Sequence, residues 1–196
     1  MSSKVQIAFV VCLAATLAGC GQNTPDDPPT GSPVSAAPSA SASASRPVVI
    51  RSLRPVAKLR SACALLSAAE LTALLGDSAG GTKVTATEDK PEKESYTCEY
   101  GSGADKPFAL VVDSSDVPTF TPKDAVDAAA SVAHVKTRRV KSVGAAAVFN
   151  ITKDGFGVIS ASKRSHGQTR SVFFSAPKDV PGSKFVKVAR LVIGRM

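Results

Sequence analysis

Serine, histidine and lysine are the side chains whose spacing decides whether this sequence encodes an enzyme. The run 76–81 (GDSAGG) places Ser78 in a glycine-rich loop, as in trypsin-type proteases, but an alanine interrupts the motif and no histidine precedes His134. Ser160–Lys163 (SASK) fits S-x-x-K, yet it ends a predicted strand instead of opening a helix. His134 and His166 could bind a metal or transfer a proton, but no carboxylate lies at a recognisable spacing from either. We therefore expect no catalytic residue, metal site or cofactor.

The four cysteines point to lipid attachment and to a disulfide. Leu17-Ala-Gly-Cys20 ends an apolar run that is too short to span a bilayer. This is the site at which a bacterial signal peptidase cuts, leaving Cys20 to carry diacylglycerol, and Cys12 is removed with the signal peptide. Cys63 and Cys98 remain, and an even pair in an oxidising compartment favours a disulfide. The alternative is a metal site, but neither cysteine belongs to a C-x-x-C motif.

Basic residues outnumber acidic ones, 24 to 16, which gives a net charge of +8. Outside the cytoplasm this charge favours anionic lipid head groups or acidic polymers, and we expect no nucleic-acid partner. Two clusters could form one anion-binding or partner-binding face if neighbouring strands bring them together. The favoured interpretation is still a solvated edge, since exposed lysines discourage sheet aggregation. The clusters are Lys136, Arg138, Arg139 and Lys141, and Lys163, Arg164 and Arg170.

Composition divides the chain into four segments. Residues 1–19 form the signal peptide, and the Pro-, Ser- and Ala-rich residues 20–46 are expected to be a disordered tether. Residues 47–60 (PVVIRSLRPVAKLR) form a basic, extended lead-in, which could contact lipid or could dock its apolar side chains on the domain. We favour docking, because Pro55 interrupts any amphipathic helix. Residues 61–196 form one globular domain.

Start signals and periodicity predict an α+β domain. Ser67 and Glu70 form a capping box, and Thr121 with Pro122 begins a second helix. Tyr96, Cys98 and Tyr100 alternate with polar residues, which places them on one face of a strand. We expect helices at 67–76, 121–136 and from 179, and strands at 83–88, 96–100, 108–112, 140–150, 156–161 and 169–175. The order is helix, three strands, helix, three strands, helix, which predicts a single antiparallel sheet of about five to six strands with helices packed on it.

The opening of the domain resembles a known family. Residues 63–76 (CALLSAAELTALLG) are similar to the C-x-L-L-x-x-x-E…L-L-G opening of a family of actinobacterial cell-envelope lipoproteins that is called a domain of unknown function. Tyr96–Tyr100, Val143–Ala147 and the closing helix at 185–193 resemble later parts of that family, although Tyr100 stands where tryptophan is common. The resemblance implies a surface lipoprotein with paired cysteines, and it assigns no catalytic residue.

These observations together predict a non-enzymatic binding module. It would be anchored to the extracytoplasmic face of the cell membrane through diacylglycerol on Cys20, as a monomer, and would bind an envelope protein, lipid or polymer. The alternative is an accessory or regulatory subunit of a transporter, sensor or secreted enzyme. A hydrolase is the third possibility, and it would require His134 or His166 to meet a carboxylate in a concave pocket.

Overall fold

The computed structural model describes residues 55–79, 84–89, 94–102, 105–133 and 135–196. All of them belong to the second of the two units into which the chain divides, Ser45–Met196. The predictions for the signal peptide, the tether, residues 47–54 and His134 lie outside the described residues. Within these described ranges, no helix is long and apolar enough to cross a membrane.

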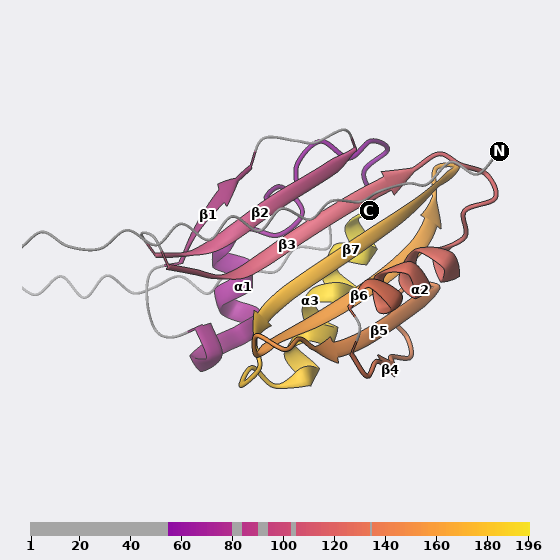
Figure 1. Ribbon diagram of the computed structural model, residues 1–196. Coiled ribbons are helices and arrows are strands. Elements are labelled where there is room, and N and C mark those ends of the chain that lie inside the picture. Colours follow the sequence, from indigo (N-terminus) through magenta and orange to yellow (C-terminus); the bar gives the residue numbers. More distant parts are fainter. Residues whose placement is uncertain (1–54, 80–83, 90–93, 103–104, 134) are drawn as a thin grey trace, which may run out of the picture. The chain divides into compact units, whose positions relative to one another are not determined.

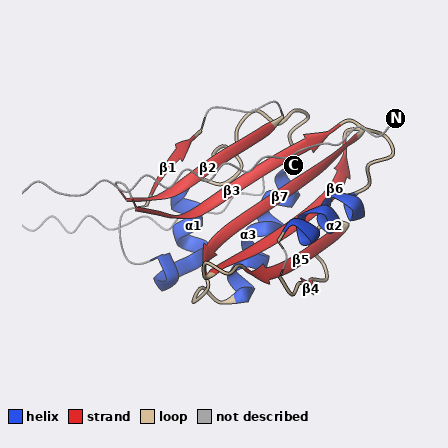
Figure 2. Cartoon of the chain, in the orientation of Figure 1, coloured by secondary structure: helices blue, strands red, loops and turns tan. Residues whose placement is uncertain are grey.

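Three α-helices and seven strands occur within the described residues (Figure 1). The helices are α1 (Ala68–Leu75), α2 (Pro122–Val132) and α3 (Gly182–Arg195), and a 3-10 turn, η1 (Gly76–Ala79), follows α1. The strands are β1 (Thr85–Glu88), β2 (Ser95–Ser102), β3 (Asp105–Ser115), β4 (Arg138–Arg139), β5 (Ala146–Ile151), β6 (Phe156–Ser165) and β7 (Gln168–Pro177). They form one antiparallel sheet in the order β1-β2-β3-β7-β6-β5-β4 (Figure 2). The prediction of an α+β domain with a single antiparallel sheet is confirmed.

The predicted number of strands is too small because 140–150 is not one strand. Ser142 and Gly144 both have positive φ angles, 62° and 58°, so the chain turns there and β5 begins only at Ala146. The residues before this turn pair with β5 as β4, which is only two residues long. A strand of that length shows no alternation in the sequence. β6 and β7 are also longer than predicted, because positive φ angles at His166 and Gly167 close the hairpin in two residues.

The helices cover the two faces of the sheet unequally (Figure 1). α1 and α3 lie on one face, whereas α2 lies across β5, β6 and β7 on the other. The face toward α3 carries the core, with Phe174 of β7 and Phe149 of β5 both in edge contact with Phe185 of α3. Cys98 and Tyr100 of β2 are buried in this core, as their alternation predicts.

The side chain of Arg170, in β7, forms hydrogen bonds with both ends of the described chain. This side chain is fully buried, and the guanidinium donates to the carbonyl oxygens of Val56, Ala57 (2.5 Å) and Met196. The amide of Val56 also donates to the Arg195 carbonyl, over 2.9 Å. The described part of the lead-in is therefore hydrogen-bonded to the domain through its main chain, and the side chain of Leu59 is buried in the core.

A second buried arginine joins α3 to α1. Arg195, 2% exposed, donates through Nη2 to Oε1 of Glu70 over 2.6 Å and through Nη1 to Oε2 over 3.0 Å. Nη1 also donates to the carbonyl of Leu65, over 2.7 Å. Glu70 simultaneously closes the predicted capping box, accepting from the amide and the hydroxyl of Ser67. One carboxylate thus caps α1 and holds it against α3.

This contact predicts a loss of stability in acid. The hydrogen bond from Arg195 is the main reason that the pKa of Glu70 falls from 4.5 to about 2; burial opposes this shift and Ser67 adds to it. The pKa of Glu70 is lower in the folded protein than in the unfolded one. The contact with Arg195 therefore stabilises the fold fully above pH 4.5, and this stabilisation is lost as the pH falls toward 2. Urea denaturation at several pH values should show the wild type and Glu70→Gln converging in stability across this range. A constant difference between them would contradict the assignment.

Candidate functional site

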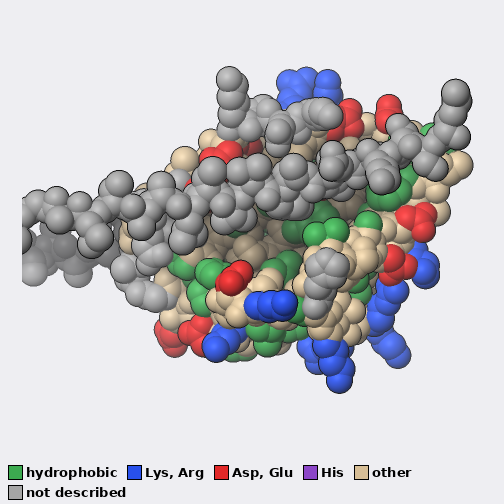
Figure 3. Space-filling model, in the orientation of Figure 1, with side chains coloured by type: hydrophobic (Ala, Val, Ile, Leu, Met, Phe, Trp, Pro, Cys, Tyr) green, Lys and Arg blue, Asp and Glu red, His purple; other side chains and the backbone are tan. Residues whose placement is uncertain are grey.

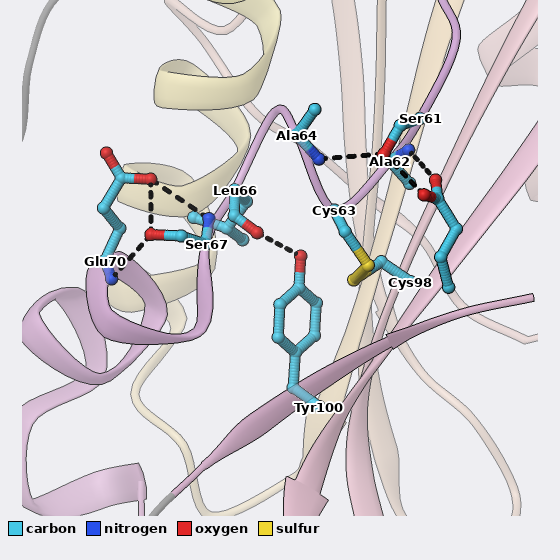
Figure 4. The surroundings of a disulfide bond; sticks show 10 residues. Ser61, Ala62, Cys63, Ala64, Leu66, Ser67, Glu70, Cys98 and Tyr100 are labelled. Atoms are coloured by element: carbon cyan, nitrogen blue, oxygen red, sulfur yellow. Dashed lines mark hydrogen bonds between the residues drawn. A yellow bond between two sulfur atoms is a disulfide. The ribbon is translucent and has the colours of Figure 1, made fainter.

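The predicted disulfide between Cys63 and Cys98 is formed (Figure 4). It joins the segment before α1 to β2, 35 residues apart in sequence, with the Cα atoms 5.1 Å apart. Glu88 of β1 positions that segment by accepting from the Ser61 hydroxyl and the Ala62 amide, both over 2.7 Å. The sulfur atoms of this pair are therefore not available to hold a metal ion.

Tyr100 provides a second connection between the same two elements. Its side chain is fully buried, and its hydroxyl donates to the carbonyl of Leu66 over 2.6 Å (Figure 4). Burial, together with the negative charges of Glu88 and Glu70, raises the pKa of Tyr100 far above its ordinary value. A tyrosine that remains protonated and bonded to the main chain is a structural residue and not an acid or base for catalysis.

The first predicted basic cluster is divided between the two faces of the sheet. Arg138 and Arg139 are consecutive residues of β4, so their side chains point to opposite faces. Arg138 lies over the ring of Phe149 on the α3 side, 5.8 Å from the ring centre, whereas Arg139 pairs with Asp127 of α2, over 2.5 Å. Lys136 is exposed in the connection that precedes β4.

The second predicted cluster has mainly structural contacts. Arg170 is buried and bound to carbonyl oxygens, which removes it from the expected anion-binding surface. Arg164 donates to Thr169 over 3.2 Å and, more weakly, to the carbonyls of Pro118 and Phe120, and so holds the segment before α2. Burial, followed by the nearby charge of Arg170, lowers the pKa of Lys163. The two clusters therefore do not form the single anion-binding face that was the alternative to a solvated edge.

A groove of about 390 Å³ lies beside the remaining part of the first cluster. Arg139 and Lys141 line it from β4 and the turn after it, Lys123 lines it from the first turn of α2, and residues 140–147 complete the wall. Lys123 and Arg139 are both bound by Asp127, each over 2.5 Å. We call this feature the β4–β5 groove. Its cationic side chains and main-chain wall could hold an anion.

Two groups with possible acid–base chemistry lie elsewhere. His166 is exposed in the hairpin turn between β6 and β7. Asp113 of β3 faces away from the core, where burial raises its pKa and a hydrogen bond with Ser95 partly offsets that rise. Its lateral neighbours in the sheet are Ser95 and Ser171. Across the described ranges, no group of three or more His, Cys, Asp or Glu side chains is arranged to hold a metal ion.

Comparison with models of protein families identifies the family to which the sequence belongs. The model of a family described as "Protein of unknown function (DUF3558)" matches residues 15–175, from before Cys20 almost to the end of β7. The chain belongs to the DUF3558 family. The expected membership of a family known as a domain of unknown function is therefore correct.

Other comparisons add no activity to this DUF3558 protein. No curated protein matches its sequence. A crystal structure from Bacteroides thetaiotaomicron VPI-5482, at 1.50 Å resolution, matches with 11% identity and a TM-score of 0.35. The match covers 54% of this chain and only 40% of the other one. A likeness at this level supports no functional argument.

The sequence did not identify Lys123 as a partner of the basic cluster in this DUF3558 protein. Lys123 precedes Arg139 by 16 residues and lies on another element, so spacing alone does not connect them. The one available signal was the pair Lys123 and Asp127, one helical turn apart, which predicts a carboxylate on the same side of α2. That this carboxylate also reaches Arg139 depends on how α2 crosses the sheet.

Proposed function

We propose that this protein is a lipoprotein, anchored by diacylglycerol on Cys20 to the outer face of the cell membrane, and that it acts there as a binding module. The observation that carries the proposal is the Cys63–Cys98 disulfide, because such bonds persist in oxidising compartments. With that pair joined, Cys12 and Cys20 are the other cysteines, and both lie in the proposed export signal. A single acyl chain binds membranes only marginally, so the two chains of diacylglycerol make a durable anchor.

Binding is favoured over catalysis because the described surface offers a groove lined by cations. Lys123, Arg139 and Lys141 surround the β4–β5 groove. These side chains suit recognition of an anionic group, because each carries a positive charge and several hydrogen-bond donors. An anchored domain with such a groove would bind an anionic component of the envelope or an acidic partner.

Lipid attachment predicts a specific difference between cysteine variants. The wild type should lose residues 1–19, gain the mass of diacylglycerol and incorporate a labelled fatty acid, because Cys20 is the attachment site. Cys20→Ser should gain neither mass nor label. Cys12→Ser is the matched control and should be lipidated like the wild type, since Cys12 precedes the cleavage site. Equal labelling of Cys20→Ser and the wild type would exclude the proposed anchor.

A further inference from the structure

The β4–β5 groove is built on a fixed main-chain wall. Gly144 packs so closely on β6 that a Cβ atom there would lie 2.4 Å from the carbonyl oxygen of Ser162. The amide of Ala145 donates to that same oxygen over 2.8 Å. On the other side, Nε of Arg190 from α3 donates to the carbonyl of Ser142 over 3.0 Å. The turn that forms the wall is therefore held in place by contacts with both β6 and α3.

Positive charge predominates around this groove. Three cations line it, and Asp127 is the carboxylate that contacts two of them, Lys123 and Arg139. Asp124, one turn earlier on α2, is occupied by the capping box with Thr121. Lys141 is exposed and has no hydrogen-bond or ion-pair partner among the described residues. Figure 3 shows Lys and Arg side chains gathered at the part of the surface occupied by β4.

The ion pairs that Asp127 makes with Lys123 and Arg139 are weak enough for another anion to compete with them. The Lys123 side chain is 71% exposed and that of Arg139 is 58% exposed, and ion pairs between such exposed groups are weak. Arg139 uses only Nη2 toward Asp127, and makes no other hydrogen bond within the described part of the chain. The guanidinium therefore has further donors to offer. Asp127 shows that the oxygens of one anion can bind Lys123 and Arg139 together.

We propose that the β4–β5 groove binds the phosphate group of a phosphate ester or diester, with Lys141, Arg139 and Lys123 as its contacts. A phosphate fits better than a carboxylate because it carries more oxygens and can reach cations on three different elements at once. A volume of about 390 Å³ also leaves space for the alcohol attached to the phosphate. This inference rests on the proposed binding role only for its choice of a ligand found in the envelope.

The test is a titration of the full chain in neutral detergent micelles, followed by the amide NMR signals of residues 140–147. The probes are inorganic phosphate, glycerol 3-phosphate and dihexanoylphosphatidylglycerol, with acetate and chloride compared at equal ionic strength. Saturable shifts with the phosphates and not with acetate or chloride are expected. Tighter binding of the phospholipid than of glycerol 3-phosphate would identify a lipid head group, and the reverse a soluble phosphate. Shifts that do not saturate, or that acetate reproduces, would overturn the proposal.

Three variants separate a specific site from general attraction of charge. Lys141→Ala should weaken phosphate binding about threefold to tenfold. Lys153→Ala removes the same charge from the turn beyond the other end of β5 and should leave binding unchanged. Asp127→Asn should strengthen binding, because it removes the competing carboxylate. Equal weakening by Lys141→Ala and Lys153→Ala would contradict the site. Loss of the lipid anchor would not change these titrations, so the two proposals can fail independently.

Discussion

Replacement of Arg195 by methionine is expected to lower the free energy of unfolding by about 3 kcal/mol. The side chain of Arg195 is 2% exposed, and its two terminal nitrogens bind both oxygens of Glu70. Methionine fills similar space but donates no hydrogen bond. The carboxylate of Glu70, itself only 15% exposed, and the carbonyl of Leu65 would each lose a donor. Urea denaturation at pH 7 measures the loss.

Two further variants show whether the buried pair is the cause. Lys187→Met makes the same kind of change on the exposed side of α3 and should alter stability by less than about 0.5 kcal/mol. Arg195→Met combined with Glu70→Leu should recover part of the loss, because the unpaired buried carboxylate is then absent. If Lys187→Met were as destabilising as Arg195→Met, the effect would belong to the helix and not to the ion pair.

Removal of the disulfide in the Cys63→Ala, Cys98→Ala double variant is expected to cost roughly 3–4 kcal/mol. The bond closes a loop of 35 residues, so its absence increases the conformational freedom of the unfolded chain. Urea denaturation should therefore show a lower midpoint and a steeper dependence on urea, because the unfolded state without the bond exposes more surface.

The single variants make this prediction more specific. Either Cys63→Ala or Cys98→Ala alone already removes the bond, so each should lose nearly as much stability as the double variant. Two small losses that add up would show that the cysteines contribute by packing and not by linking the segments. Reduction of the wild type should reproduce the double variant.

Local patterns in the sequence predicted most elements of the fold. Ser67 with Glu70 and Thr121 with Pro122 gave the correct starts of α1 and α2, because these start signals lie within three positions of each other in the sequence. The alternation around Cys98 gave the correct buried face of β2, since side chains in a strand alternate between faces. These features do not depend on distant parts of the chain.

The features that the sequence did not predict depend on distant contacts. The pairing of β3 with β7 joins the two halves of the sheet, and no turn between neighbouring strands specifies it. Arginine is seldom buried without partners, so the charge of Arg170 alone predicts that it lies on the surface. Its partners are carbonyl oxygens at Val56, Ala57 and Met196, which the sequence does not bring together. The sequence likewise does not show that Lys123, Arg139 and Lys141 line one groove.

The contacts of Arg170 also determine how the domain would carry a mechanical load. Val56 and Ala57, where the chain enters the described domain, are held by a side chain of β7. β7 lies between β3 and β6, well inside the sheet. Tension applied through the residues ahead of Pro55 would therefore reach an inner strand and be shared by the hydrogen bonds on both of its sides. An edge strand such as β1 is bonded to a neighbour on one side only, whereas β7 is bonded to β3 and β6 on its two sides.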